Sequence, residues 1–220
     1  MTVEILAGGA ELLPQYSKIP STFAVSSFFR VERDQGGLGG IKLIEEKVAQ
    51  PYTKDYDEEE EDRPLRWARN FDTSQWRFLL ALDGDIVVGG AAVAFNTPGI
   101  YMLCGGDGQT LTDIAALWDI RVSPPHRRRG VGTRLFRRAA DWARQQGCKL
   151  LKIETQNINV PACRFYGKQG CGLGGIDLYG YRGHYAVEHE VRLIWYLDLR
   201  DGPSADTAVS GPQAEHRQRI

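Results

Sequence analysis

The sequence predicts one domain of the α/β (α+β) class, in which helices pack against a sheet. The chain has 220 residues, 42% of them hydrophobic, which is enough for one well-buried core. Two β-rich runs flank Asp83-Gly84, and this dipeptide is a strong hairpin signal. Residues 117–166 then read in order as a strand, a basic turn with glycines, an amphipathic helix, a strand and a short helix.

We expect residues 23–200 to form this domain, with residues 1–22 as a weakly patterned lead-in and residues 201–220 as a disordered polar tail. The chain does not open with a basic segment followed by an apolar run. No stretch reaches the roughly 18 apolar residues of a membrane span. The sequence therefore predicts a cytoplasmic protein without a membrane partner.

The overall charge of the chain predicts neither nucleic acid nor an anionic membrane as a partner. The formal net charge is -1, so nothing attracts nucleic acid or anionic lipid to the chain as a whole. The cysteines form no CxxC pair, so we expect reduced thiols, no disulfide and no metal site. These cysteines are Cys104, Cys148, Cys163 and Cys171.

The first strands are expected at residues 23–32 and 41–48, which are rich in aromatic and β-branched residues. The glycines of GGLGG, residues 36–40, suit a mobile hairpin tip between them. A phosphate-binding loop would need a Lys-Ser/Thr pair at a following helix start, and Ile41-Lys42-Leu43 does not supply it. We therefore predict an antiparallel strand pair here.

An acidic stretch follows at residues 51–64, PYTKDYDEEEEDRP. Its run from Glu59 to Asp62 is typical of a solvated loop or helix start. In the first half, Tyr52, Asp55, Tyr56 and Asp57 alternate aromatic rings with carboxylates, a pattern that suits a cationic ligand through ion pairs and cation–π contacts.

A β-hairpin is expected from residues 76–82 and 86–95. Gly89-Gly90 in its second strand indicates a bulge or a close backbone approach. Residues 96–113 contain Pro98-Gly99 and Gly105-Gly106 and are expected to form an irregular loop.

The next strand is expected at residues 115–122, ended by Pro124-Pro125. Gly130 precedes a helix that Gly147 ends, because apolar residues recur there at three and four residues. These apolar residues are Val131, Leu135, Phe136, Ala139, Trp142 and Ala143.

A short strand is expected at residues 150–154, followed by a helix that Asn159 caps and Gly170 closes. We expect the last strands at residues 176–181 and 187–199.

The turn RRRGVG, residues 127–132, places small glycines and arginines where a strand meets a helix. The N-terminus of a helix carries about half a positive charge and unpaired N–H donors, so this turn suits a pyrophosphate. The spacing alone also fits a basic helix start with a tight turn.

Arg127-x-x-Gly130-x-Gly132, after the strand LWDIRVSP, matches the acyl-CoA-binding signature of the GNAT acetyltransferases, and the resemblance runs from about Trp76 to Leu199. A dinucleotide-binding site would need GxGxxG directly after an opening strand, and the hairpin-first order differs. The resemblance implies a mixed, strongly twisted sheet that splays open between the strands ending at Val122 and Glu154.

The resemblance also implies an acetyl-CoA site and no metal. The pantetheine arm would pair with the backbone of Ile120 and Val122, and Asn159 would contact it. Backbone N–H groups would meet the pyrophosphate, and they belong to Arg127, Arg128, Arg129, Gly130, Val131, Gly132 and Thr133.

The acceptor of such an enzyme is an amine that must lose a proton. For a lysine-like pKa near 10.4, exposing the neutral amine at pH 7 costs on the order of 4 to 5 kcal/mol. Glu154 is our preferred base, and Asp119 is the reserve as base or ammonium anchor. Either carboxylate could instead be paired with an arginine such as Arg121. Tyr166 matches the family's tyrosine that protonates the CoA thiolate, although a lone helical tyrosine is more often a core residue.

A closer resemblance, to the streptothricin acetyltransferases, rests on PYTKDYD, LWDIRV, RRRGVG and ETQNINVPACRFY running into GCGLGGIDLY. That family acetylates the β-lysine amine of a polycationic antibiotic. The implied acidic pocket would contain Asp55, Asp57, Asp119, Glu154 and Asp177, with aromatic walls from Tyr56, Trp118 and Tyr179.

Two other functions stay open at this point. The spacing from Glu154 to Tyr166 also resembles that of enzymes that acetylate protein N-termini. A non-catalytic acyl-CoA-binding module would keep the turn and lack turnover. The expected partner is a small cationic amine, and the sequence is compatible with a homodimer.

Overall fold

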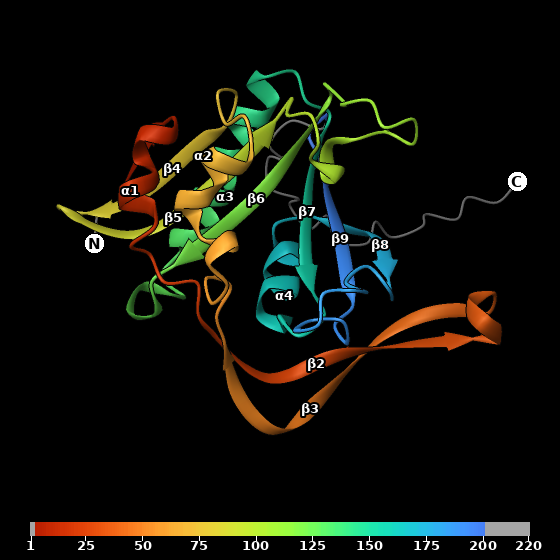
Figure 1. Cartoon of the computed structure of the whole chain (residues 1–220). Coiled ribbons are helices and arrows are strands. Elements are labelled where there is room, and N and C mark those ends of the chain that lie inside the picture. The colour runs from red at the N-terminus through yellow and green to blue at the C-terminus, as the bar shows by residue number, and fades with distance from the viewer. Residues whose placement is uncertain (1–2, 201–220) are drawn as a thin grey trace, which may run out of the picture.

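The structure, a computed structural model, describes residues 3–200 (Figure 1). The tail expected at residues 201–220 lies outside this range. The main sheet has seven strands in the order β1-β4-β5-β6-β7-β9-β8, and β2 and β3 form a separate two-stranded ribbon. The sheet strands are β1 (Val3–Gly8), β4 (Arg77–Asp83), β5 (Ile86–Phe95), β6 (Ile114–Val122), β7 (Leu150–Gln156), β8 (Gly172–Asp177) and β9 (Arg192–Asp198).

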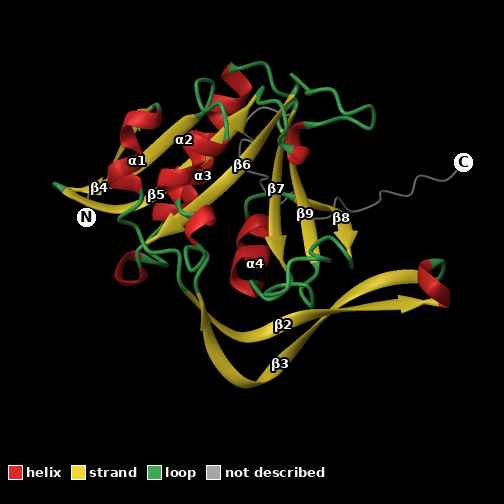
Figure 2. Ribbon diagram, viewed as in Figure 1, coloured by secondary structure: helices red, strands yellow, loops and turns green. Residues whose placement is uncertain are grey.

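Helices cover both faces of the sheet (Figure 2). On one face, α3 (Val131–Gln145) and α4 (Val160–Lys168) take part in the larger core, which includes Leu135, Phe136 and Tyr166. On the other face, α1 (Leu13–Tyr16) and α2 (Pro64–Asn70) enclose a second, aromatic-rich core. Short 3-10 turns lie at Ala10–Leu12, Gln35–Gly37, Glu60–Asp62, Tyr101–Leu103 and Pro124–His126. The mixed sheet and its helices confirm the predicted fold class.

The elements with strong local signals lie where the sequence predicts them. β4 and β5 pair as a hairpin around Gly84, which has φ +60. The helix α3 begins after Gly130 and ends before Gly147, and both glycines have φ +82. The side chain of Asn159 caps α4 by accepting a hydrogen bond from the N–H of Ala162 at 3.1 Å.

The predicted close backbone approach at Gly89-Gly90 is confirmed. A Cβ on Gly90 would lie 2.6 Å from Cε2 of Tyr16, and a Cβ on Gly89 would lie 3.0 Å from the carbonyl oxygen of Arg121. The pairing of β4 with β5 also shifts register beside these residues, between Ala81 and Leu82. Glycine therefore lets α1 pack directly onto β5.

The expected lead-in is part of the domain, which corrects the boundary at residue 22. β1 pairs antiparallel with β4 along its whole length. Tyr16 is fully buried, and Ile19 is 1% exposed. The local pattern of these residues is weak because β1 is a half-exposed edge strand, and only its pairing with β4 defines it.

The last strands also differ from the prediction. The glycine-rich residues 172–175, which precede the predicted strand, belong to β8, and Gly174 leaves space for the ring of Tyr196 on β9. The strand expected at residues 176–181 is thus shifted toward the N-terminus, the one expected at residues 187–199 is shorter, and residues 178–191 form turns instead. The expected irregular loop at residues 96–113 is present and carries the turn Tyr101–Leu103 and a bridge from Cys104 to Thr110.

The ribbon of β2 (Phe23–Asp34) and β3 (Gly40–Lys54) confirms the predicted strand pair and is longer than expected. It runs below the sheet and past the end of β7 (Figure 1). Asn157 joins the ribbon to the rest of the domain through two hydrogen bonds. The backbone N–H of Phe29 donates to the carbonyl oxygen of Asn157 at 2.9 Å, and the side-chain amide of Asn157 donates to the carbonyl oxygen of Phe29 at 3.0 Å.

No helix among residues 3–200 is long and apolar enough to cross a membrane. In the same part of the chain, no group of three or more His, Cys, Asp or Glu residues could hold a metal ion. Cys148, Cys163 and Cys171 are buried, and Cys104 is partly exposed.

Candidate active site

The sheet opens between β6 and β7. These parallel strands pair only from Ile114 to Leu117 with Leu150 to Ile153. Beyond that point β6 pairs with β5 alone and β7 with β9 alone, so the two strands diverge (Figure 1). Trp118 is an extra residue at this point, since Ala92 pairs with Asp119 and Val93 with Leu117. The edge of β6 from Trp118 to Val122, including Ile120, therefore has no strand partner toward β7.

The basic turn lies at the end of that unpaired edge. Arg128 and Gly130 have φ of 60 and 82, which folds the chain sharply into α3. The first N–H groups of α3, at Val131, Gly132 and Thr133, precede the first intrahelical hydrogen bonds. A Cβ on Gly132 would lie 3.6 Å from the ring of Phe165 and 3.8 Å from Cγ2 of Val122, which are ordinary contacts, so packing within the chain does not require glycine there. Close approach of a ligand would require it.

Arg127 is engaged within the chain. Its Nε donates to the carbonyl oxygen of Val122 at 2.9 Å, and its Nη2 donates to that of Thr22 at 2.5 Å. Its backbone N–H donates to the carbonyl oxygen of Pro124 at 3.3 Å. Arg127 thus fixes the turn to the end of β6, and the N–H donors open to an anion lie further along the turn.

Among the described residues, one carboxylate oxygen of Glu154 has a hydrogen-bond partner and the other has none. The hydroxyl of Tyr181 donates to its Oε1 at 2.8 Å, while Oε2 is buried without a hydrogen-bond partner among the described residues. Burial raises the pKa of Glu154 above its usual range, and the hydrogen bond from Tyr181 and the charge of Arg192 oppose that rise. A buried carboxylate with a free oxygen suits a proton acceptor.

Asp119 has the ion-pair arrangement that the sequence left open as an alternative. Its Oδ2 accepts hydrogen bonds from Tyr16 at 2.7 Å and from Nε of Arg121 at 2.6 Å. Arg121 also binds Asp57, through Nη1 at 2.6 Å and Nη2 at 3.2 Å. Its guanidinium is fixed further by the carbonyl oxygen of Ile19 at 3.1 Å. Glu154 is therefore the better candidate base, because Asp57 and Asp119 are both already paired with Arg121.

Among the acidic and aromatic residues 52–57, Tyr56 is the one that is hydrogen-bonded to Gln156 of β7 and to Asn159. The hydroxyl of Tyr56 donates to Oε1 of Gln156 at 2.5 Å and accepts from the amide of Asn159 at 3.1 Å. Asp55 accepts hydrogen bonds from Ser21 at 2.5 Å and from the N–H of Asp57 at 3.0 Å, and these bonds lower its pKa. The Asp55 carboxylate therefore holds its own turn, while the Asp57 carboxylate is paired with Arg121 of β6. Tyr52 is 43% exposed on the ribbon.

Tyr166 lies where α4 meets the opening of the sheet. Its ring packs against Phe136 and Trp195, with centroids 6.3 and 6.4 Å away. Burial raises the pKa of Tyr166, and the nearby Tyr56 and Asp119 raise it further. Tyr166 is 6% exposed, and its ring is part of the larger core.

The remaining residues that the sequence predicts for the acceptor pocket are Asp177, Tyr179 and Trp118. Asp177 is ion-paired with Arg192 at 2.5 Å, and Tyr179 is 66% exposed beside it. Trp118 packs into the aromatic core, with ring centroids 5.2 Å from Phe71 and 5.4 Å from Trp76. Trp118 is partly buried and packs against the second core.

Three residues of this region were not predicted: Tyr181, Arg192 and Glu190. Glu190 is 2% exposed, accepts from Nζ of Lys54 at 3.3 Å and leaves Oε2 without a described partner. Burial raises the pKa of Glu190. Tyr181 and Glu190 lie within the turns of residues 178–191, so no periodicity marks them in the sequence.

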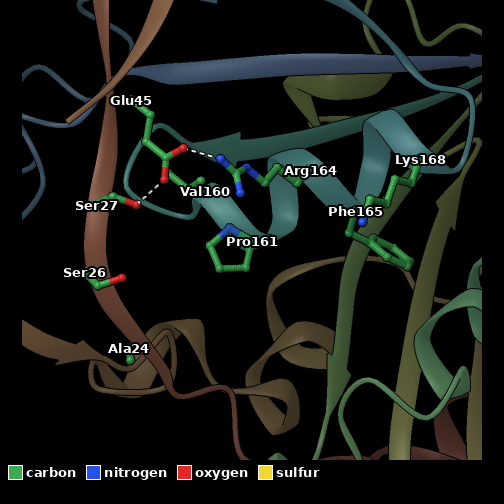
Figure 3. Close-up of a pocket in the computed structure, with 9 residues that line it drawn as sticks. All are labelled: Ala24, Ser26, Ser27, Glu45, Val160, Pro161, Arg164, Phe165 and Lys168. Atoms are coloured by element: carbon green, nitrogen blue, oxygen red, sulfur yellow. Dashed lines mark hydrogen bonds and ion pairs between the residues drawn. The ribbon is translucent and has the colours of Figure 1, made fainter. Parts of the chain in front are cut away.

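A cleft of about 440 Å³ lies between β2 and α4 (Figure 3). Arg164 of α4 binds Glu45 of β3 across it, Ser27 of β2 also binds Glu45, and Lys168 lies at its far end from β2. Phe165, which lines the cleft, also faces Gly132 of the basic turn. The cleft therefore adjoins the turn. Its lining residues are Ala24, Ser26, Ser27, Glu45, Val160, Pro161, Arg164, Phe165 and Lys168.

The chain is similar to known acetyltransferases. The model of the Acetyltransferase (GNAT) family matches residues 41–172. Streptothricin acetyltransferase of Streptomyces lavendulae is 30% identical over 166 residues, which are 75% of this chain and 79% of that protein. Streptothricin acetyltransferase of Escherichia coli is 41% identical over 87 residues, or 40% of this chain, and this match spans 50% of that relative's length.

A solved structure extends the similarity to the fold and to a bound molecule. A Bacillus anthracis (strain Ames) protein, crystallised in complex with acetyl coenzyme A, superposes with a TM-score of 0.69 at 26% identity. The match covers 90% of this chain and 99% of that one. The splayed sheet and basic turn thus belong to an architecture that binds acetyl coenzyme A in that protein.

Proposed function

Because the chain belongs to the acetyltransferase (GNAT) family, we propose that it transfers the acetyl group of acetyl-CoA to a primary amine of a cationic small molecule, the β-lysine amine of streptothricin. The observation that carries the proposal is the buried, unpartnered Oε2 of Glu154 at the opening of the sheet. The similarity to streptothricin acetyltransferases supports the choice of acceptor.

The donor site would consist of backbone groups. N–H groups from Val131 to Thr133 and the positive end of α3 suit a pyrophosphate, and Gly132 leaves it room. The unpaired edge of β6 from Trp118 to Val122 offers backbone groups to the amides of the pantetheine arm. These groups bind and orient acetyl-CoA, which supplies the activated acetyl group.

The acceptor ammonium would lose its proton to Glu154, directly or through water. Tyr181 holds Oε1 of that carboxylate and leaves Oε2 to take the proton. The neutral nitrogen then forms the C–N bond with the thioester carbon as the C–S bond breaks. N–H groups of β6 near Ile120 would stabilise the negative charge on the carbonyl oxygen.

We predict that Tyr166→Phe lowers kcat by about ten- to a hundredfold, because the departing thiolate loses its proton donor while a thiol pKa near 8.5 makes the loss tolerable. The dissociation constant of acetyl-CoA should stay unchanged, since the ring still packs against Phe136 and Trp195. Stopped-flow thiol release and calorimetric titration of acetyl-CoA measure the two quantities. An unchanged kcat would remove the proposed role of Tyr166.

We extend the donor site to the cleft beside α4 (Figure 3), where Lys168 and Arg164 suit the 3′-phosphate end of the donor. Lys168→Glu is then expected to raise the KM for acetyl-CoA about two- to fivefold, as for a part-exposed ion pair. The KM for the dephospho form of acetyl-CoA should not change. Lys18→Glu, on the opposite face of the sheet near α1, is the matched control. Equal effects on both donors would place the phosphate elsewhere.

The function is tested by thiol release from acetyl-CoA across a panel of amines. The panel contains streptothricin, lysine analogues, aminoglycosides and N-terminal peptides, and mass spectrometry of the streptothricin product locates the acetyl group. We expect the highest kcat/KM with streptothricin. The proposal fails if streptothricin is no better than the other amines.

Acetylation of peptide N-termini is the second candidate, because the spacing of Glu154 and Tyr166 is similar to that of enzymes with this activity. It predicts turnover of peptides and little turnover of streptothricin in the same panel. A non-catalytic acyl-CoA-binding module would bind acetyl-CoA and release no thiol with any amine.

A further inference from the structure

Arg192 of β9 is held between two aromatic rings. Its guanidinium carbon lies 5.1 Å from the ring centroid of Tyr101 and 5.8 Å from that of Tyr181. Nη2 of the same guanidinium binds Oδ2 of Asp177 at 2.5 Å. These contacts join three segments of the chain, the loop of residues 96–113, β8 and the turns of residues 178–191, to one side chain.

Tyr181 depends on such contacts for its position. The segment around it has no strand or helix between β8 and β9, so neither ladder nor helical hydrogen bonds fix its ring. The ring is nevertheless buried, 9% exposed, and its hydroxyl donates to Glu154 across 27 positions of sequence. The guanidinium of Arg192 packs against that ring and helps to fix its position.

We propose that Arg192, held by Tyr101 and Asp177, positions Tyr181 against Glu154 and so fixes the carboxylate that faces the acceptor amine. This inference rests on the proposed function, because it assigns Glu154 the role of base. It also gives the loop of residues 96–113 a task, since Tyr101 of that loop contacts Arg192.

The charged groups around Glu154 also support this role of Arg192. Burial raises the pKa of Glu154, the hydrogen bond from Tyr181 and the positive charge of Arg192 lower it, and the carboxylate of Asp177 raises it. Asp119 is ion-paired with Arg121, and its charge raises the pKa of Tyr166. Removing the charge of Arg192 must therefore raise the pKa of Glu154 and reduce its ionised fraction at a given pH.

The test compares Arg192→Met and Arg192→Lys with the unaltered chain. For Arg192→Met we expect the acid limb of the kcat/KM profile to move upward by about one pH unit, the lower end of the effect of a neighbouring charge. The KM for acetyl-CoA should change less than about twofold, because the donor site is untouched. Arg192→Lys keeps the charge and should restore most of the profile.

Tyr101→Ala and Tyr101→Phe test the support of Arg192. The alanine variant removes the ring and is expected to reproduce part of the effect of Arg192→Met, whereas phenylalanine keeps the ring and should behave like the unaltered chain. Arg182→Met, at an exposed position of the same turn segment, is the matched control.

Titration of ¹³C-labelled glutamate carboxyls by NMR, with Glu154 assigned through Glu154→Gln, follows the same charge without any substrate. A rise of the Glu154 pKa in Arg192→Met supports the inference even if streptothricin proves not to be the acceptor. An unmoved Glu154 titration together with an unmoved pH profile overturns it. An equal loss in Arg192→Met and Arg182→Met also overturns it, since that result indicates general destabilisation.

Discussion

Glu154→Gln is expected to lower kcat/KM for the acceptor amine by about 10²- to 10⁴-fold at neutral pH, the range that a positioned general base contributes. The amide keeps the shape of the side chain and can still accept from Tyr181, but it cannot take a proton from the ammonium. The dissociation constant of acetyl-CoA should not change. Steady-state kinetics with the best amine of the panel and calorimetric titration of acetyl-CoA measure these values.

The pH dependence of kcat/KM and of Tm in the same variant tests the direction of the pKa shift of Glu154. Because the pKa of Glu154 is raised by burial, the active enzyme should gain kcat/KM as pH rises through that pKa, and Glu154→Gln should lose this limb. The same shift favours the protonated carboxyl in the folded state, so the stability that it contributes at low pH is lost as pH rises through the folded pKa. Glu154→Gln should therefore raise Tm at neutral pH while it lowers the rate.

A nearby exposed residue controls for the change of charge. Glu188 lies in the turns of residues 178–191 and is exposed, so Glu188→Gln should leave both kcat/KM and Tm close to those of the unaltered chain. If Glu154→Gln keeps full activity and its acid limb, the base lies elsewhere, and Asp119 becomes the next candidate despite its ion pair with Arg121.

The parts of the fold that the sequence predicts well are those with local causes. Asp83-Gly84 allows one tight turn, the apolar stripe of α3 fits one face, and Asn159 caps α4 through its own side chain. β1 and the glycine-rich first half of β8 were not predicted, because distant partners define them. β1 is a strand through its pairing with β4, and the glycines of β8 make sense only beside Tyr196 of β9.

The candidate site also has parts that the sequence predicts and parts that it does not. The basic turn is predictable because its chemistry lies in consecutive backbone groups, and Glu154 and Tyr166 are carried by the regular elements β7 and α4. The partners of the carboxylates are not predictable, because Arg121 meets Asp57 across 64 positions and Tyr181 meets Glu154 across 27. Alternating aromatic and acidic residues at 52–57 resemble an exposed ligand site, yet tertiary contacts use most of them internally.

Arg121→Met is expected to lower the free energy of unfolding by about 3 to 5 kcal/mol, as for a buried ion pair that loses one partner. The side chain of Arg121 is 5% exposed, and it joins Asp57, Asp119 and the carbonyl oxygen of Ile19. It also lies over the ring of Tyr16, 5.5 Å from the centroid. Urea unfolding followed by tryptophan fluorescence measures the loss.

The expected loss arises from two uncompensated carboxylates more than from the missing attraction. Combining Arg121→Met with Asp57→Asn and Asp119→Asn should therefore recover part of it, because no buried charge then lacks a partner. Arg30 offers the matched control: it also binds two glutamates, Glu32 and Glu46, but is 43% exposed, so Arg30→Met should cost less than about 1 kcal/mol. If Arg121→Met costs no more than Arg30→Met, solvent already screens the network, and Asp57 and Asp119 become available to a cationic acceptor after all.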